Sequence, residues 1–248
     1  MVYALRGALG DVLFQRGLPR ADHASAYQAL FNTRHLQLYR RQVPCPLLLD
    51  VGVEGGRIKV MARLFGFADL WRDELLAALI SALNRGVSIS ENSSERSPWE
   101  VLDFHYMQHQ RVPEVPDGPN LRVCPKSALC FGAEEHLRWE PERFVLAAFS
   151  RVTLMARWHR VLLNVSMPGL AEARSRTRPR LGRQGPATRL YKASRQHPKR
   201  HMTLVGEASE LLLYVPDPDW REALALASNC GAGGHTVYGF GRFHLRQA

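Results

Sequence analysis

An α+β fold is predicted for this chain, because strand patterns and amphipathic helix patterns follow one another in an irregular order along its 248 residues. Two apolar stretches, 47–53 and 57–65, flank the turn 54–56 and are typical of a hairpin. Apolar residues at helical spacing follow over 69–85, and a capped helix over 217–230 leads into a closing strand. These observations predict two ferredoxin-like (RRM-like, βαββαβ) halves in tandem, with a basic insertion in the second half.

The N-terminal half is assigned to residues 1–110. Weak alternation over 2–13 predicts its first strand, and Asp22 can cap a helix over 24–41. The hairpin and its helix come next, and residues 99–107 predict a fourth strand. The expected order is therefore strand, helix, two strands, helix and strand.

The C-terminal half is assigned to residues 144–248, after a linker and ambiguous helical segment at 111–143. The linker is expected because residues 113–125 hold four prolines and a glycine. Residues 172–201 are expected to form a loop or mobile arm, since prolines and glycines recur in them. This arm leaves no clear place for the first helix of the half. The remaining apolar stretches predict strands at 152–158, 161–165, 202–205 and 210–215.

The positive charge of the chain is concentrated in the same arm. The formal net charge is +10, and residues 172–201 carry ten Lys or Arg against one acid, a balance of +9. The other residues hold 23 basic and 22 acidic side chains, a balance of +1. Such a segment is typical of an element that binds a polyanion through phosphate contacts. The predicted RNA-binding residues of the arm are Arg174, Arg176, Arg178, Arg180, Arg183, Arg189, Lys192, Arg195, Lys199 and Arg200.

Other site classes are disfavoured. The four cysteines (Cys45, Cys124, Cys130 and Cys230) include no C-x-x-C pair, so reduced and mostly packed thiols are expected and a zinc site is not. Neither a metal nor a cofactor is expected. No apolar run is long enough to span a membrane, and the first residues lack the regions of a signal peptide, so a cytoplasmic location is expected.

A glycine-rich stretch near the C-terminus contains Gly231, Gly233, Gly234, Gly239 and Gly241. It follows a helix and precedes a strand, whereas a dinucleotide-binding loop follows a strand and opens a helix. The stretch GAGGHTVYGFGRF, together with Leu64-Phe65-Gly66, resembles the RAMP superfamily. Within that superfamily it is most similar to the CRISPR-associated endoribonucleases that cut precursor CRISPR RNA in its repeats. The basic arm and the short length point to a type IV-like branch.

The resemblance implies where the site should lie. In that family the glycine-rich loop lies against the RNA backbone, and the catalytic group lies on or just after the first helix. The positions that fit are His35 as general base, His23 as a further candidate, and Arg34 with Arg242 as phosphate clamps. RNA contacts are also expected from Arg40, Arg41 and the five glycines.

The implied reaction needs no metal, because the 2′-OH of the RNA is itself the nucleophile. The protein has to align it, take up its proton and stabilise the developing charge, which gives a 2′,3′-cyclic phosphate and a 5′-OH end. The implied partners are a stem-loop CRISPR repeat RNA and other subunits of an effector complex that retains the product. The alternative is a non-catalytic RNA-binding scaffold subunit of a CRISPR ribonucleoprotein. A metal-dependent nuclease is disfavoured because the chain lacks an Asp/Glu cluster.

Overall fold

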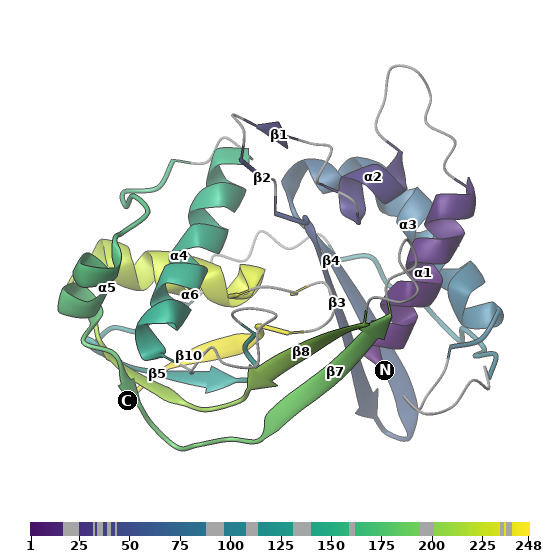
Figure 1. Ribbon diagram of the computed structural model, residues 1–248. Helices are drawn as coiled ribbons and strands as arrows, with labels where there is room; N and C mark the ends of the chain where they lie inside the picture. The colour runs from purple at the N-terminus through teal and green to yellow at the C-terminus, as the bar shows by residue number, and fades with distance from the viewer. Residues whose placement is uncertain are drawn as a thin grey trace. The chain divides into compact units, whose positions relative to one another are not determined.

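The computed structural model describes residues 1–16, 25–31, 33, 37–38, 41–42, 44–87, 97–107, 114–130, 140–158, 162–193, 201–233, 236 and 240–248. Its contacts divide the chain into two compact units. One consists of Met1–Gln110 with Val237–Gly239, and the other of Arg111–Thr236 with Phe240–Ala248. Both mix helices with antiparallel strands, so the predicted α+β class is confirmed (Figure 1).

The N-terminal unit begins with a helix, α1 (Val2–Arg16), where a strand was predicted. The prediction was wrong because weak alternation was given more weight than a helical pattern. Leu5, Leu9 and Val12 recur at helical spacing and are buried. A Cβ on Gly10 would lie 3.5 Å from the ring of Phe31, which is an ordinary packing distance, so this glycine marks where that ring packs against the helix.

A short helix, α2 (Ala26–Leu30), occupies part of the stretch predicted as a helix over 24–41. Its start is fixed by a capping box, in which the backbone N–H of Gln28 donates to Ser25 Oγ at 3.2 Å. The helix ends at Leu30, and β1 (Gln37–Leu38) pairs with β2 (Arg41–Gln42). The prediction of a single long helix over 24–41 was therefore wrong, because two paired strands occupy 37–38 and 41–42.

The predicted hairpin and its helix are confirmed. β3 (Leu47–Glu54) pairs antiparallel with β4 (Arg57–Leu64), and the Gly55-Gly56 turn has φ of +58° and +75°. Two left-handed residues in a two-residue loop match the twist of the strands, which explains the glycines. The 3₁₀ helix η2 (Gly66–Trp71) leads into α3 (Arg72–Asn84), whose buried residues pack with α1, α2 and β3.

The fourth strand predicted at 99–107 is not formed. Residues 97–107 contain only an isolated bridge between Ser97 and Val87, and Trp99 donates its backbone N–H to the carbonyl of Leu83 at 3.0 Å. Apolar and aromatic residues in this stretch suggested a strand, but several of them are exposed, including Phe104 and Met107.

The C-terminal unit is built on a sheet of four antiparallel strands in the order β10-β5-β9-β6. The strands are β5 (Asn120–Pro125), β6 (Arg180–Leu181), β9 (Leu211–Tyr214) and β10 (Phe243–Gln247). With the helices α4 (Pro141–Trp158) and α6 (Pro218–Cys230), the chain order is β5-α4-β6-β9-α6-β10. This is the βαββαβ pattern predicted for this half.

β5 lies in the stretch that was predicted to be a connector. The prolines around it concealed the alternation of buried Leu121 and Val123 with exposed Asn120 and Arg122. Proline is tolerated at the ends of a strand, and here Pro119 precedes β5 while Pro125 closes it.

α4 replaces the strand predicted at 152–158, and residues 162–165 form no strand either. The first helix of this half therefore precedes the basic arm. Phe149 and Trp220 pack with ring centroids 4.5 Å apart and join α4 to α6. Both helices cover one face of the sheet (Figure 1), and the core between them and the sheet includes Phe144, Phe149, Leu121, Leu211, Leu213, Leu224 and Phe243.

The basic arm is folded over much of its length, so the predicted loop was wrong there. It contains α5 (Leu170–Thr177), β6, and β7 (Ala187–Ala193), which pairs with β8 (His201–Glu207). The β7–β8 hairpin is an insertion between the second and third strands of the βαββαβ unit. The predicted insertion exists, as a hairpin.

The closing helix and strand are confirmed. Asp217 caps α6 by accepting the backbone N–H of Asp219 at 3.0 Å, and Pro218 stands at the first helical position. β10 then pairs with β5 over its whole length.

Candidate nucleic-acid interface

The described residues of the glycine-rich stretch that joins α6 to β10 are held by backbone hydrogen bonds, one within the stretch and one to Ala128. Gly231, Gly233 and Gly241 have positive φ values of 79°, 84° and 81°. The N–H of Gly241 donates to the carbonyl of Ala128 at 2.9 Å, and its carbonyl accepts the N–H of Ala232 at 2.8 Å. A Cβ on Gly241 would collide with the Ala232 carbonyl oxygen. The N–H of Gly241 is thus used inside the protein, and this glycine is required for close backbone packing.

Arg242 follows this contact and is fixed through its backbone. Its N–H donates to Ser127 Oγ at 3.0 Å, and its carbonyl accepts the N–H groups of Lys126 at 2.8 Å and Ser127 at 3.2 Å. The backbone of Arg242 is consequently positioned by one segment distant in sequence, residues 126–127, and Arg242 is half-buried.

Positive charge gathers around His244, the second residue of β10. Partial burial lowers the pKa of its imidazole below 6.5, and nearby positive charges lower it further. These charges belong to Lys126, Arg246 and Arg242. The imidazole is therefore mainly neutral at pH 7, in a field that attracts anions. Sequence reasoning gave Arg242 a role but missed Lys126 and Arg246.

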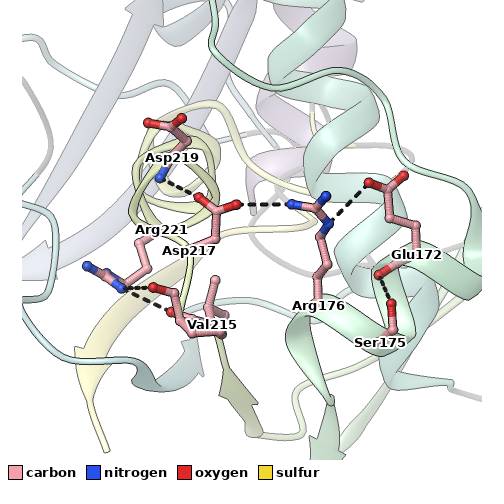
Figure 2. A network of polar contacts seen from close by, with 8 residues as sticks. Glu172, Ser175, Arg176, Val215, Asp217, Asp219 and Arg221 are labelled. Atoms are coloured by element: carbon pink, nitrogen blue, oxygen red, sulfur yellow. Dashed lines mark hydrogen bonds and ion pairs between the residues drawn. The ribbon is translucent and has the colours of Figure 1, made fainter.

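Two arginines of the arm are engaged in ion pairs within the C-terminal unit. Arg174 Nε lies 2.8 Å from Glu142 Oε1. Arg176 lies 3.3 Å from Glu172 and 3.0 Å from Asp217, the carboxylate that caps α6 (Figure 2). Its guanidinium also lies 5.3 Å from the centroid of the Trp220 ring. These contacts tie α5 to α4 and α6.

The next arginines of the arm have a different environment. Arg178, with φ of 37°, places its guanidinium 5.1 Å from the centroid of the Tyr214 ring. Arg180 lies on β6 opposite Leu212. Both are exposed and form no ion pair within the described part of the chain. Arg183 and Arg189 are also exposed, and Lys192 lies on β7.

Many predicted site residues lie outside the described residues, and their roles stay predictions. Arg41 lies on β2, where only its backbone is described. The predicted residues outside the description are His23, Arg34, His35, Arg40, Arg195, Lys199, Arg200, Gly234 and Gly239.

Metal and membrane sites find no support in the described part of the chain. It contains no group of three or more His, Cys, Asp or Glu side chains that could hold a metal ion. The four cysteines are thiols rather than disulfides, and their packing agrees with the expectation: Cys130 and Cys230 are buried, and Cys45 and Cys124 are half-buried. None of the helices described is both long and apolar enough to cross a bilayer.

Solved structures provide the comparison that decides the fold. A Cas6 (TTHA0078) product complex matches with a TM-score of 0.55 and 16% identity, covering 99% of this chain and 93% of that chain. A substrate mimic complex of the same protein gives 0.52 and 15%, with coverage of 99% and 92%. A Cas6 (TTHB231) product complex gives 0.53 and 13%, covering 99% and 93%. The chain has the Cas6 fold.

The resemblance inferred from the glycine-rich stretch is therefore confirmed as a likeness of fold along nearly the whole chain, not only over the motifs that suggested it. A scan against protein-family models finds no match, and a search of curated proteins finds no similar sequence. At 13–16% identity the likeness does not transfer individual residues. The type IV-like branch stays a prediction.

Proposed function

We propose that this protein is a metal-independent endoribonuclease that cuts CRISPR precursor RNA within repeat hairpins. The observation that carries the proposal is the Cas6 fold, shared over 99% of the chain with structures described as product and substrate mimic complexes. The electrostatics agree with it, because the loop-to-β10 junction gathers cations around His244 at the place where the family's glycine-rich loop meets RNA.

The proposed reaction begins with attack of a ribose 2′-OH on the adjacent phosphorus. Negative charge then develops on the phosphoryl oxygens, and Arg242 is the residue proposed to stabilise it. Its backbone is fixed by Ser127 and Lys126, which suits a group that must be in place before the transition state forms. The P–O5′ bond then breaks and the leaving oxygen takes up a proton, which gives a 2′,3′-cyclic phosphate and a 5′-OH end.

The proton of the 2′-OH needs an acceptor. We propose His35 for this role, with Arg34 as a second phosphate clamp and His23 as a further candidate. Among the described residues His244 has suitable electrostatics, because its lowered pKa leaves the imidazole neutral at pH 7. The pH dependence of cleavage would report which imidazole acts. A base with a lower pKa stays deprotonated to a lower pH, so the cleavage rate begins to fall only at that lower pH.

The proposal is tested by incubating the protein with end-labelled repeat RNA in EDTA. A single cut with a cyclic phosphate end is expected. A substrate with a 2′-deoxy nucleotide at the cut should remain intact, because its nucleophile is missing. His35→Ala should abolish cleavage with binding retained, and Arg157→Gln is the matched surface control. RNA that is bound but never cut would support the scaffold subunit instead.

Retention of the product in an effector complex is part of the same proposal. It predicts that RNA co-purified with the protein, after expression with a CRISPR array, ends at the cut. Fast release of the cut RNA during gel filtration would argue against retention and leave the cleavage activity itself unaffected.

A further inference from the structure

The sheet of the C-terminal unit has one covered and one open face. Leu121 of β5 and Leu213 of β9 point into the core beneath α4 and α6. Side chains alternate along a strand, so the residues next to these leucines point to the other face of the sheet. Those residues include Arg122, Leu212 and Tyr214, and all three are exposed. The open face therefore presents side chains of its own to solvent.

A single row of residues crosses the open face along the strand pairing. Arg246 of β10 pairs with Arg122 of β5. Arg122 pairs with Leu212 of β9, and Leu212 pairs with Arg180 of β6. We call these four exposed residues the arginine row. With strands about 4.8 Å apart, the row spans about 14 Å.

The arginine row costs stability in the free protein. Like charges directly opposite each other on neighbouring strands are destabilising, and Arg246 stands opposite Arg122. None of the four strands contains Asp or Glu. In the described part of the chain the three arginines form no ion pair. A departure from stable pairing without local compensation is typical of a functional surface.

An aromatic ring lies beside the row. Tyr214 is two residues after Leu212 on the same face, opposite Asn120, and is 37% exposed. The guanidinium of Arg178 lies 5.1 Å from the centroid of its ring. An exposed ring next to cations suits stacking on a nucleobase. A duplex would hide the faces of its bases, whereas a single strand offers bases and phosphates together.

We propose that this open face binds single-stranded RNA, with phosphates on the arginine row and a base on Tyr214. Other four-stranded RNA-binding sheets hold two or three bases on one face, which agrees with the size of this surface. The inference rests on the proposed function only for the nature of the polyanion. It adds a binding surface for an unpaired RNA segment, separate from the contacts to the repeat hairpin and to the bond that is cut.

The test measures binding of the full chain to two fluorescent RNAs in EDTA over a range of salt concentrations. One is an unstructured oligouridylate of about ten nucleotides, and the other a hairpin without single-stranded flanks. The variant Arg122→Gln/Arg246→Gln removes two charges from the open face. Its control, Arg143→Gln/Arg157→Gln, removes two charges from α4 on the covered side, and of these two Arg143 pairs with a carboxylate, Glu140. Tyr214→Leu removes the ring, and Tyr214→Phe keeps it.

The open-face variant should lower the slope of log affinity against log salt by about 1.4 for the oligouridylate, from about 0.7 for each lost phosphate contact. Its melting temperature should not fall, whereas loss of a structural pair would lower it. Tyr214→Leu should weaken oligouridylate binding on the order of tenfold, with Tyr214→Phe close to wild type.

Equal slopes for the open-face variant and the α4 control would overturn the proposal. An equal loss for the hairpin would also overturn it, because the face would then hold a duplex. Cleavage of repeat RNA is measured separately. If the wild-type protein cuts no repeat RNA but the open-face variant binds oligouridylate more weakly, the proposed nuclease activity is wrong and the RNA-binding face is supported. If the wild-type protein cuts normally and the variant binds oligouridylate as the wild type does, the RNA-binding face is wrong and the nuclease activity is supported.

Discussion

The basic arm contains arginines in ion pairs, such as Arg176, and arginines without one in the described part of the chain, such as Arg180. Substitution of Arg176 tests whether the first group has a structural role. Arg176→Gln removes ion pairs to Glu172 and Asp217 and the contact with Trp220. Exposed ion pairs contribute about 0.2–1 kcal/mol each, and an exposed cation–π contact about 0.5–1 kcal/mol. The side chain is 49% exposed, so the low end of each range applies and the sum is about 1 kcal/mol.

For a unit of this size that loss corresponds to a fall of about 3–5 °C in melting temperature. Thermal unfolding followed by circular dichroism measures it. Arg180→Gln is the matched control: it removes the same charge from a residue without an ion pair in the described part of the chain. It should keep its melting temperature and instead reduce the salt dependence of RNA binding. If Arg176→Gln left the melting temperature unchanged and reduced the salt dependence of RNA binding as Arg180→Gln does, the structural role assigned to Arg176 would be wrong.

Three further predictions concern the fold and β10. Gly241→Ala should destabilise the protein by about 2–3 kcal/mol in urea unfolding, since φ is 81° and the Cβ would meet the Ala232 carbonyl; a wild-type midpoint would contradict this packing. Phe149→Ala should cost about 3–5 kcal/mol, because the ring is fully buried against Trp220, and a loss below about 1 kcal/mol would show that this core is loose. The pKa of His244, followed by NMR, should lie below 6.5 and rise in Arg246→Gln. Because its folded pKa lies below the unfolded value, the unfolded state binds more protons, so this group's contribution to stability falls as pH drops through 6.5; a pKa at or above 6.5 would refute the electrostatic picture.

Local sequence signals predicted the elements whose ends are set by turn or capping residues. The Gly55-Gly56 turn defines the β3–β4 hairpin, and Asp217-Pro218 defines the start of α6. Elements that depend on packing were missed. Glycines within α1 obscured a helix that is stabilised by burial of Leu5 and Leu9, and prolines concealed the central strand β5.

The candidate site shows a similar division. Sequence identified a basic arm, yet Arg174 and Arg178 look alike in it. Glu142 neutralises Arg174 from a different helix, whereas Arg178 lies against Tyr214. Partners this distant in sequence cannot be read from local composition. Arg122 and Arg246 escaped notice for the same reason, since only the strand register places them side by side.

The position of the β7–β8 hairpin has a consequence for how such proteins diversify. The hairpin leaves the sheet from β6, its outermost strand, and returns to β9, so none of the pairings among the four sheet strands depends on its length. Doubling a connection costs only about 0.6 kcal/mol in closure entropy. The hairpin can thus lengthen or shorten in evolution while the four-stranded sheet stays intact.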